Sequence, residues 1–287
     1  MIDTPEKIGI IGYGTMGQVI ARNLVAQNNE LNIFVFDKDK SKLNVSSGIS
    51  VAQDVKDLAE RAGIIILAVK PQDFTHVLKE IKGCVNNKLI LSIAAGISTK
   101  YIESILGAAR VIRIMPNIGA KISESVSCLC QGALATGEDL ELAQELFYYL
   151  GPTRVIDEDM MNAATAISGS GPAYVFYFVE NNSLDPENIP EHARHDMMRR
   201  LEKAAEELGF SVEDAAFLAA NTVNASISLL RKTKLPAPEL RKQVTSKGGT
   251  TEAALDILTK GGTWTDAAKA ALKRAEELAG GYKRCLK

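Results

Sequence analysis

The sequence lacks the features that mark several classes of protein. Its 287 residues hold only three histidines, four cysteines and one tryptophan. Lys and Arg number 33 against 35 Asp and Glu, and the net charge of −2 favours neither nucleic acid nor an anionic membrane. No uninterrupted apolar run is long enough to span a bilayer. We therefore expect neither nucleic acid nor a membrane among the partners of this protein.

The scarcity of cysteine and the N-terminal residues indicate a reducing compartment. Cys128 and Cys130 fall on one face of an expected strand, which is typical of core packing rather than of half a zinc site. His192 and His195 share a helical face, but the charged residues around them favour a solvated surface. The opening residues MIDTPEK carry acids and a proline, unlike a signal peptide. We expect a cytoplasmic protein that holds no metal. The four cysteines are Cys84, Cys128, Cys130 and Cys285.

The first half of the chain alternates short apolar runs with helical patterns. The run GIIILAVKP is continuously apolar, which is typical of a strand buried on both faces. This alternation predicts an α/β fold with a Rossmann-type, doubly wound parallel sheet over residues 1–158. Strands are expected at 7–11, 32–36, 63–71, 88–93, 110–115, 126–130 and 154–156. Helices are expected up to about residue 27, around 54–61 and at 138–150.

The second half changes character after Met160. Ala, Leu, Glu and Lys dominate, and apolar residues recur at spacings of three and four. Helices are expected at 191–208, 211–231 and 263–285. The pattern predicts an all-helical domain over residues 159–287 that packs against a second subunit.

A glycine-rich loop follows the first expected strand and opens a helix. Gly12 permits a tight turn, Gly14 lets the backbone approach a pyrophosphate, and Gly17 lets the helix pack against the strand. The amides at the helix start and the helix dipole then favour the phosphates. Asp37, about twenty residues beyond Gly17, ends the second strand and completes the dinucleotide-binding pattern.

The choice between NADP and NAD stays open, with NADP slightly ahead. Asp37 suits the ribose hydroxyls of NAD and repels a 2′-phosphate, whereas Lys38, Ser41 and Lys42 offer that phosphate positive charge and donors. Lys70 is either a catalytic acid or, as is commoner beside a proline, a residue that orients its loop. The predicted cofactor contacts are Gly12, Tyr13, Gly14, Thr15, Met16, Asp37, Lys38, Ala68, Val69, Lys70, Pro71 and Asn117.

A second glycine turn, in TSKGGTTEAAL, begins another helix. The bare amides of Gly248 and Gly249 at a helix start favour an anion. Alternatively, Thr250 or Thr251 only caps the helix, whose first turn holds Glu252.

Four motifs together resemble those of the pyrroline-5-carboxylate reductase family. They are AVKPQ, SIAAGI, SGSGPAYVF from Ser168 and VTSKGGTTEAAL from Val244, and the resemblance covers almost the whole chain in the same order. It implies an N-terminal dinucleotide-binding domain and a C-terminal helical domain that interlocks with a second subunit, with dimers that often assemble into decamers. It also implies NAD(P)H-dependent reduction of 1-pyrroline-5-carboxylate to L-proline.

The resemblance assigns the second glycine turn to the substrate, a cyclic imino acid. It implies that Ser246, Thr250 and Thr251 surround the substrate, that Thr251 lies against the ring nitrogen and that the turn's amides hold the carboxylate. Thr251 is the expected catalytic residue, as an orienter or proton relay. The predicted substrate contacts are Ser246, Lys247, Gly248, Gly249, Thr250 and Thr251.

Three departures from the family keep other hypotheses open. Lys247 stands where the family usually has proline, and Asn162 stands where an aspartate is common. The polar stretch 181–200 replaces a nearly continuous helix. Because of Lys247, the reduction of another cyclic imine or a related carbonyl acid stays open as an alternative function. Because of the polar stretch, a nucleotide-binding regulatory protein without efficient catalysis also stays open.

Overall fold

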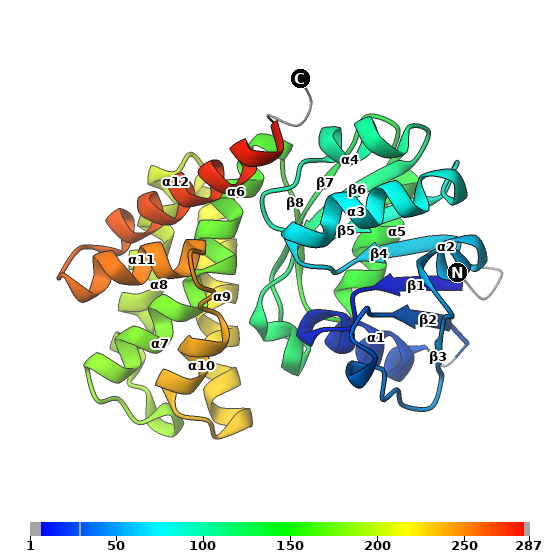
Figure 1. Cartoon of the computed structure of the whole chain (residues 1–287). Helices are drawn as coiled ribbons and strands as arrows, with labels where there is room; N and C mark the ends of the chain where they lie inside the picture. The colour runs from blue at the N-terminus through cyan, green and yellow to red at the C-terminus, as the bar shows by residue number, and fades with distance from the viewer. Residues whose placement is uncertain (1–6, 29, 284–287) are drawn as a thin grey trace. The chain divides into compact units, whose positions relative to one another are not determined.

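The computed structural model describes residues 7–28 and 30–283, which form two compact units (Figure 1). The first unit holds the described residues up to 114, together with 129–149 and 282–283; the second holds 115–128 and 150–281. The predicted domain boundary after residue 158 stays a prediction. Cys285 and the end of the helix expected to reach it lie outside the described residues.

The first unit is built around a parallel sheet, as predicted. Its strands β1 to β6 are Lys7–Ile11, Asn32–Phe36, Ile49–Val51, Ile64–Leu67, Leu89–Ser92 and Arg110–Met115. The sheet order is β3-β2-β1-β4-β5-β6-β7-β8, where β7 is Ser127–Gln131 and β8 is Thr153–Val155. Ile11, at the end of β1, pairs in parallel with Phe36 of β2 and with Leu67 of β4. The strand order therefore reverses between β1 and β4, where ligands bind in folds of this kind.

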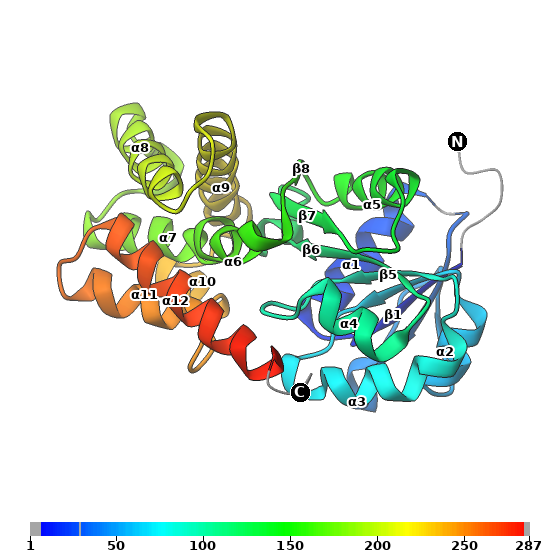
Figure 2. The ribbon, with the colours of Figure 1, turned by 90° about the horizontal axis from the view of Figure 1, so that it is seen from above.

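Helices cover both faces of this sheet (Figure 2). They are α1 (Thr15–Gln27) and α5 (Gly137–Tyr148) on one face, with α2 (Val55–Arg61), α3 (Pro71–Ile81) and α4 (Thr99–Leu106) on the other. Leu58, Phe74 and Ile102, one from each of the latter three helices, are fully buried in one core with Ile65 and Ile90 of the sheet. Burial of the sheet on both faces explains its continuous apolar strands.

Three elements of the first unit were not predicted from the sequence. Strand β3 has only three residues and only Ile49 is buried, so its pattern is too short to detect. Helix α3 begins at Pro71, where no helix was predicted, because proline suits the first position of a helix. Helix α4 begins after Ser98, whose side chain accepts a hydrogen bond from the amide of Tyr101 and caps the helix.

The second unit contains the helices of the C-terminal half. They are α6 (Met161–Ala164), α7 (Gly171–Asn181), α8 (Glu191–Glu207), α9 (Val212–Thr233), α10 (Ala237–Gln243), α11 (Thr250–Thr259) and α12 (Trp264–Lys283). A π-helical turn, Thr165–Gly169, joins α6 to α7. None of the helices in the described part of the chain is both long and apolar enough to cross a membrane.

Helices α7 and α9 form the core of the second unit. Residues 171–176 of α7 are buried, and α9 packs against α7 and α8. A Cβ on Gly171 would lie 3.0 Å from Thr222 of α9 and 3.4 Å from Leu201 of α8. Glycine at this position therefore lets the helices approach closely.

Candidate functional site

The glycines of the first loop have three distinct surroundings. Gly12 has a φ of +100°, and a Cβ there would lie 2.6 Å from the backbone of Ala68. A Cβ on Gly17 would lie 2.0 Å from the carbonyl oxygen of Gly12, whereas a Cβ on Gly14 would meet no atom within 4 Å. Gly12 thus makes the turn, Gly17 brings α1 close to β1, and Gly14 leaves its backbone open to a ligand.

A pocket of about 390 Å³ opens beside this loop in the first unit. Of the predicted cofactor contacts, it is lined by Gly12, Gly14, Asp37, Lys38, Ala68, Val69 and Lys70. The pocket is not lined by the other predicted contacts of this unit, which are Tyr13, Thr15, Met16 and Pro71. The amides of Thr15 and Met16 at the start of α1 are nevertheless open, because no described residue accepts a hydrogen bond from them. Such amides are the donors that hold phosphates at helix N-termini.

Asp37 is buried and its carboxylate is occupied by its own chain. One oxygen accepts a hydrogen bond from the amide of Tyr13 at 2.8 Å. The other accepts from the amide of Asp39 at 2.9 Å and lies 3.3 Å from the ammonium of Lys42. Asp37 therefore fixes the glycine loop as well as facing the pocket.

Lysines and acids alternate beside Asp37 at the pocket. Lys38 pairs with Asp73 of α3 at 2.7 Å, and Lys42 lies 3.7 Å from Asp39. Hydrogen bonds from Ser41 lower the pKa of the Asp39 carboxyl, which keeps it charged. Both ammonium groups are exposed enough to leave these partners for a phosphate.

Sequence reasoning missed the wall of the pocket formed by α3. Its polar face contributes Gln72, Asp73, His76 and Glu80. Their spacing along a helix is the signal that could have revealed them, had α3 been predicted. Lys70 is exposed at the N-cap position of α3, where its carbonyl accepts from the amide of Asp73, an arrangement typical of a loop-orienting residue.

Asn117 belongs to the second unit and is buried within a polar network. Its side-chain oxygen accepts from the amide of Gly119 at 2.9 Å, and its side-chain nitrogen donates to the carbonyl of Ser168 at 3.2 Å. The network holds the loop after β6 in place. The same region contains Cys128, whose complete burial raises the pKa of its thiol to about 12.

The second glycine turn lies in the second unit and begins α11. Gly248 has a φ of +69°, in the left-handed region that favours glycine. The amide of Gly249 donates to the carbonyl of Ser246 at 3.0 Å and closes the turn. Ser246 and Lys247 are exposed at its edge.

Three hydroxyl groups converge where this turn meets α7. Thr251 is 5% exposed, and its Oγ1 donates to the Oγ of Ser170 at 3.2 Å. Ser170 is 1% exposed and also lies 3.0 Å from the Oγ1 of Thr250. Sequence reasoning did not assign Ser170 to the site, because about eighty residues separate it from both threonines and no local pattern links them.

The start of α11 offers open donors to an anion. No described residue accepts a hydrogen bond from the amides of Thr250, Thr251 and Glu252. Gly249 is the N-cap residue, and no side chain caps the helix. The alternative in which Thr250 or Thr251 caps the helix is therefore wrong, because both threonines lie inside it and their hydroxyls face Ser170.

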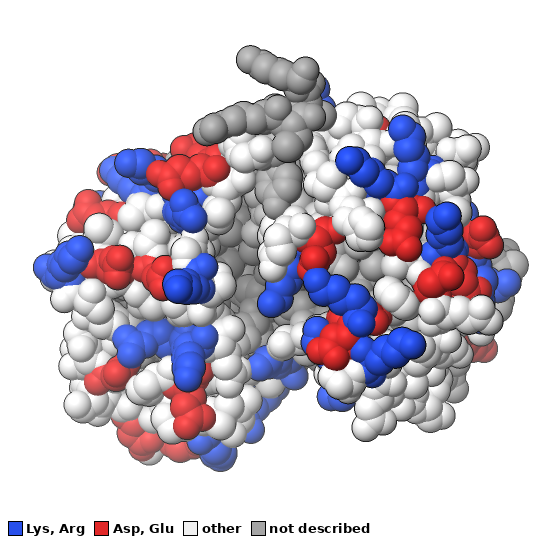
Figure 3. All heavy atoms as spheres, in the orientation of Figure 1, with Lys and Arg blue, Asp and Glu red and all other residues white. Residues whose placement is uncertain are grey.

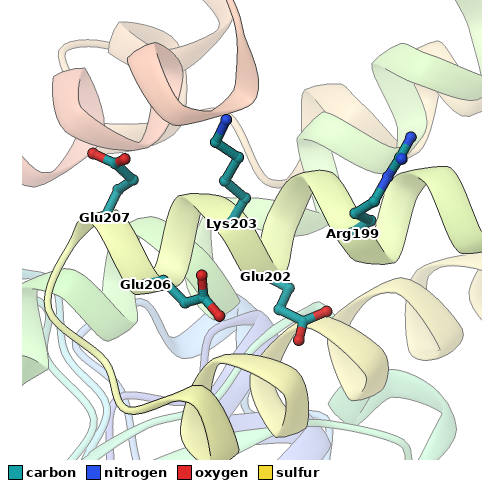
Figure 4. Close-up of a pocket in the computed structure, with 5 residues that line it drawn as sticks. All are labelled: Arg199, Glu202, Lys203, Glu206 and Glu207. Atoms are coloured by element: carbon teal, nitrogen blue, oxygen red, sulfur yellow. The ribbon is translucent and has the colours of Figure 1, made fainter.

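Outside the two glycine turns, neither a hollow on α8 nor a cluster of metal-binding side chains adds ligand chemistry among the described residues. A hollow on α8 is lined only by charged side chains of both signs, which extend from opposite sides of the helix (Figure 4). They are Arg199, Glu202, Lys203, Glu206 and Glu207. Within the described ranges, no three His, Cys, Asp or Glu side chains gather as metal ligands would. Acidic and basic groups also intermingle over the face shown in Figure 3.

The fold and the glycine loop define a dinucleotide-dependent oxidoreductase. Residues 7–96 match the model of NADP oxidoreductases, coenzyme F420-dependent. Residues 158–183 and 195–278 match the model of the pyrroline-5-carboxylate reductase dimerisation region. The chain belongs to the pyrroline-5-carboxylate reductase family, as its motifs predicted, and it carries that family's region for self-association.

Relatives and solved structures agree with this assignment. A pyrroline-5-carboxylate reductase of Aquifex aeolicus is 34% identical over 259 residues, covering 89% of this chain and 90% of the relative. One from Methanosarcina acetivorans is 33% identical over 283 residues, covering 95% and 98%. The structure of a pyrroline-5-carboxylate reductase from Coxiella burnetii has a TM-score of 0.64 at 31% identity, covering 96% of this chain and 99% of that one. A Plasmodium falciparum pyrroline carboxylate reductase with NADP bound has a TM-score of 0.63 at 26% identity, covering 96% and 98%.

Proposed function

We propose that this protein reduces 1-pyrroline-5-carboxylate to L-proline with NADPH. The observation that carries the proposal is the start of α11, where three open amides adjoin the hydroxyl cluster of Thr250, Thr251 and Ser170. The amides suit a carboxylate and the hydroxyls suit a ring nitrogen, the two polar groups of this imino acid. Membership of the reductase family supports the same substrate.

The reaction adds a hydride to carbon and leaves a proton on nitrogen. When bound, the nicotinamide supplies the hydride to the carbon of the C=N bond, whose π electrons pass to nitrogen. A substrate bound with its nitrogen protonated already carries the required proton. Since Thr251 donates its own proton to Ser170, its oxygen keeps lone pairs that accept a hydrogen bond from this N–H group. Thr251 is too weak an acid to protonate the nitrogen alone, so its proposed role is to orient the substrate.

The test follows NADPH absorbance with purified protein and pyrroline-5-carboxylate. We expect turnover in the wild type and a loss of about 10²-fold in Thr251→Ala, the size of loss that a misplaced substrate can cause. Thr259→Ala is the matched control, because Thr259 lies at the exposed end of the same helix and bonds only the carbonyl of Asp256. Cofactor binding without turnover would reject the reductase and favour the regulatory alternative.

We propose NADPH rather than NADH because the carboxylate of Asp37 is already bonded to Tyr13, Asp39 and Lys42. It is therefore poorly placed to accept ribose hydroxyls, while Lys38 and Lys42 line the pocket. Lys42→Ala and Lys38→Ala should raise the KM for NADPH by about tenfold, the size of one charge-assisted contact, and leave that for NADH unchanged. Equal KM changes for both cofactors would remove these lysines from 2′-phosphate binding.

A second candidate substrate is another cyclic imino acid. Lys247 favours it, since this side chain is exposed at the edge of the turn and makes no ion pair with a described residue. A larger ring or a second acidic group would reach it. Comparing kcat/KM for five-membered and six-membered imino acids in wild type and Lys247→Ala distinguishes the two: a preference for the larger ring that depends on Lys247 would favour the second candidate.

We further propose that the protein acts in the cytoplasm as a homodimer able to assemble into decamers. Its dimerisation region supports the dimer. Cys84, Cys128 and Cys130 are free thiols, which suits a reducing compartment.

A further inference from the structure

The turn before α11 is held from both sides at Gly248. The amide of Gly248 donates to a carboxylate oxygen of Glu252 at 2.7 Å. Its carbonyl accepts from the Nε of Arg274, also at 2.7 Å. A Cβ built on Gly248 would lie 3.6 Å from the Arg274 guanidinium, so the guanidinium lies close against the turn. One residue of the proposed substrate site is thus clamped by two charged side chains of opposite sign.

These contacts decide which amides remain open to the substrate. Glu252 occupies the amide of Gly248, and Ser246 occupies that of Gly249. The donors left are the amides of Thr250 and Thr251, followed by that of Glu252 itself. The donors open to the substrate carboxylate, which the resemblance assigns to the glycine amides, are therefore the amides that follow directly, at the first residues of α11.

Arg274 reaches the turn from another element. It lies on α12, which runs beside α11 (Figures 1 and 2). Its Nη1 pairs with Glu277 at 2.9 Å, which orients the guanidinium, and its side chain is 35% exposed. The hydrogen bond that joins Arg274 to this site is made to the carbonyl of Gly248, so we expect its influence on a ligand to pass through that residue.

We propose that Arg274 is a positioning residue that sets the substrate-carboxylate site. By binding the carbonyl of Gly248 it fixes the turn so that the amides of Thr250 and Thr251 are aligned before the substrate arrives. A site ordered in advance loses less conformational entropy on binding. The identity of the ligand rests on the proposed function, whereas the two contacts that clamp Gly248 are seen in the structure itself.

The test compares Arg274→Met with Lys273→Met. Lys273 lies next to Arg274 on α12, is exposed and contacts no residue of the turn, so its variant removes the same charge without touching the clamp. We expect Arg274→Met to raise the KM for pyrroline-5-carboxylate about tenfold with kcat changed less than about threefold. We expect Lys273→Met to match the wild type.

Two further measurements distinguish a positioning role of Arg274 from a general loss of structure in the variant. The variant should leave kcat/KM for 1-pyrroline unchanged, because that imine has no carboxylate. Arg274→Lys should recover part of the KM loss, since lysine keeps the charge but not the planar donors. An equal loss for both imines, or a KM within twofold of wild type, would overturn the proposal.

Hydrogen exchange tests the clamp without any substrate. Amides of residues 246–252 should exchange faster in Arg274→Met than in Lys273→Met or wild type, because the turn opens more often. If wild type reduces neither imine, the proposed function fails, and the exchange result still decides the clamp. Unchanged exchange in Arg274→Met would contradict it.

Discussion

Ser170 is the residue around which the proposed chemistry is organised. It is buried, it accepts the hydrogen bond of Thr251, and it lies 3.0 Å from the hydroxyl of Thr250. Buried hydroxyls that lose a partner leave the other group unsatisfied, which costs more than the hydrogen bond itself contributes. Ser170 therefore determines which way the hydroxyl of Thr251 points.

Removing the hydroxyl of Ser170 should lower turnover, because this hydroxyl orients that of Thr251. We expect Ser170→Ala to lower kcat about tenfold, and to have no further effect in a Thr251→Ala background, because residues that act as a unit are not additive. Steady-state kinetics of both single variants and the double variant measure this coupling. Ser226→Ala is the control, since Ser226 is equally buried but bonds the carbonyl of Thr222 in its own helix. Additive losses would show that Ser170 and Thr251 act independently.

Single residues were predictable from the sequence where their neighbours in space are also neighbours in the chain. Gly12, Gly14 and Gly17 fall within one turn, so the geometry that requires glycine is encoded in their spacing. Ser170 bonds threonines of another helix and Arg274 bonds the turn that precedes that helix, and no periodicity relates them to it. Only the packing of α7, α11 and α12 brings these side chains together.

Helix α2 is stabilised at its end by a lysine from a different element. The ammonium of Lys88, just before β5, donates to the carbonyls of Ala59, Glu60 and Ala62 at 2.5, 3.0 and 2.8 Å. These carbonyls have no partner within the helix, and its dipole favours a cation there. Partial burial lowers the pKa of Lys88 because the ammonium group loses hydration. The three carbonyl acceptors compensate that group for the lost water.

Replacing Lys88 should destabilise the first unit. We expect Lys88→Met to lower its free energy of unfolding by about 1–3 kcal/mol, because the partly buried carbonyls of Ala59 and Ala62 are left without a donor. Urea unfolding measures the change. Lys79→Met, at an exposed position of α3, should change stability by less than about 0.5 kcal/mol. A similar effect of both substitutions would show that the three hydrogen bonds contribute little.

At the level of helices and strands, prediction succeeded where patterns are long. The expected strand at 32–36 and the expected helix at 191–208 agree with β2 and α8 to within a residue. Strand β3 was missed because three residues hold no periodicity, and α3 because its proline was taken only as a loop signal. The start of α11 was mistaken for a possible threonine cap, since a glycine N-cap leaves no side-chain signature.

The chain as a whole departs from its family most clearly at one segment. Residues 184–194 fall outside the match to the dimerisation model. This segment is fastened to its own chain: the carbonyl of Pro186 accepts from Arg231 at 2.7 Å, and Glu187 pairs with Lys234. Both partners lie on α9 or at its end, so the segment is bonded to that helix of its own chain.

The assembly should therefore survive this departure. We expect the purified protein to have at least twice the mass of one chain in solution at micromolar concentration, since the matched residues on both sides of the segment are retained. Light scattering coupled to size-exclusion chromatography measures the mass, and a dilution series separates the dimer from larger assemblies. A monomer at every concentration would contradict the prediction.

The hydrogen bond between Asp37 and the amide of Tyr13 has a consequence for protein engineering. In proteins of this fold, the acid that ends the second strand helps to set the preference between NAD and NADP. Here that acid also holds the glycine loop that we expect to receive the pyrophosphate, so exchanging Asp37 should change the binding of the pyrophosphate as well as that of the ribose. A redesign that leaves Asp37 in place and alters Lys38 and Lys42 separates the two effects. We therefore expect that coenzyme preference can be changed by substituting the exposed Lys38 and Lys42 while the buried carboxylate of Asp37 is retained.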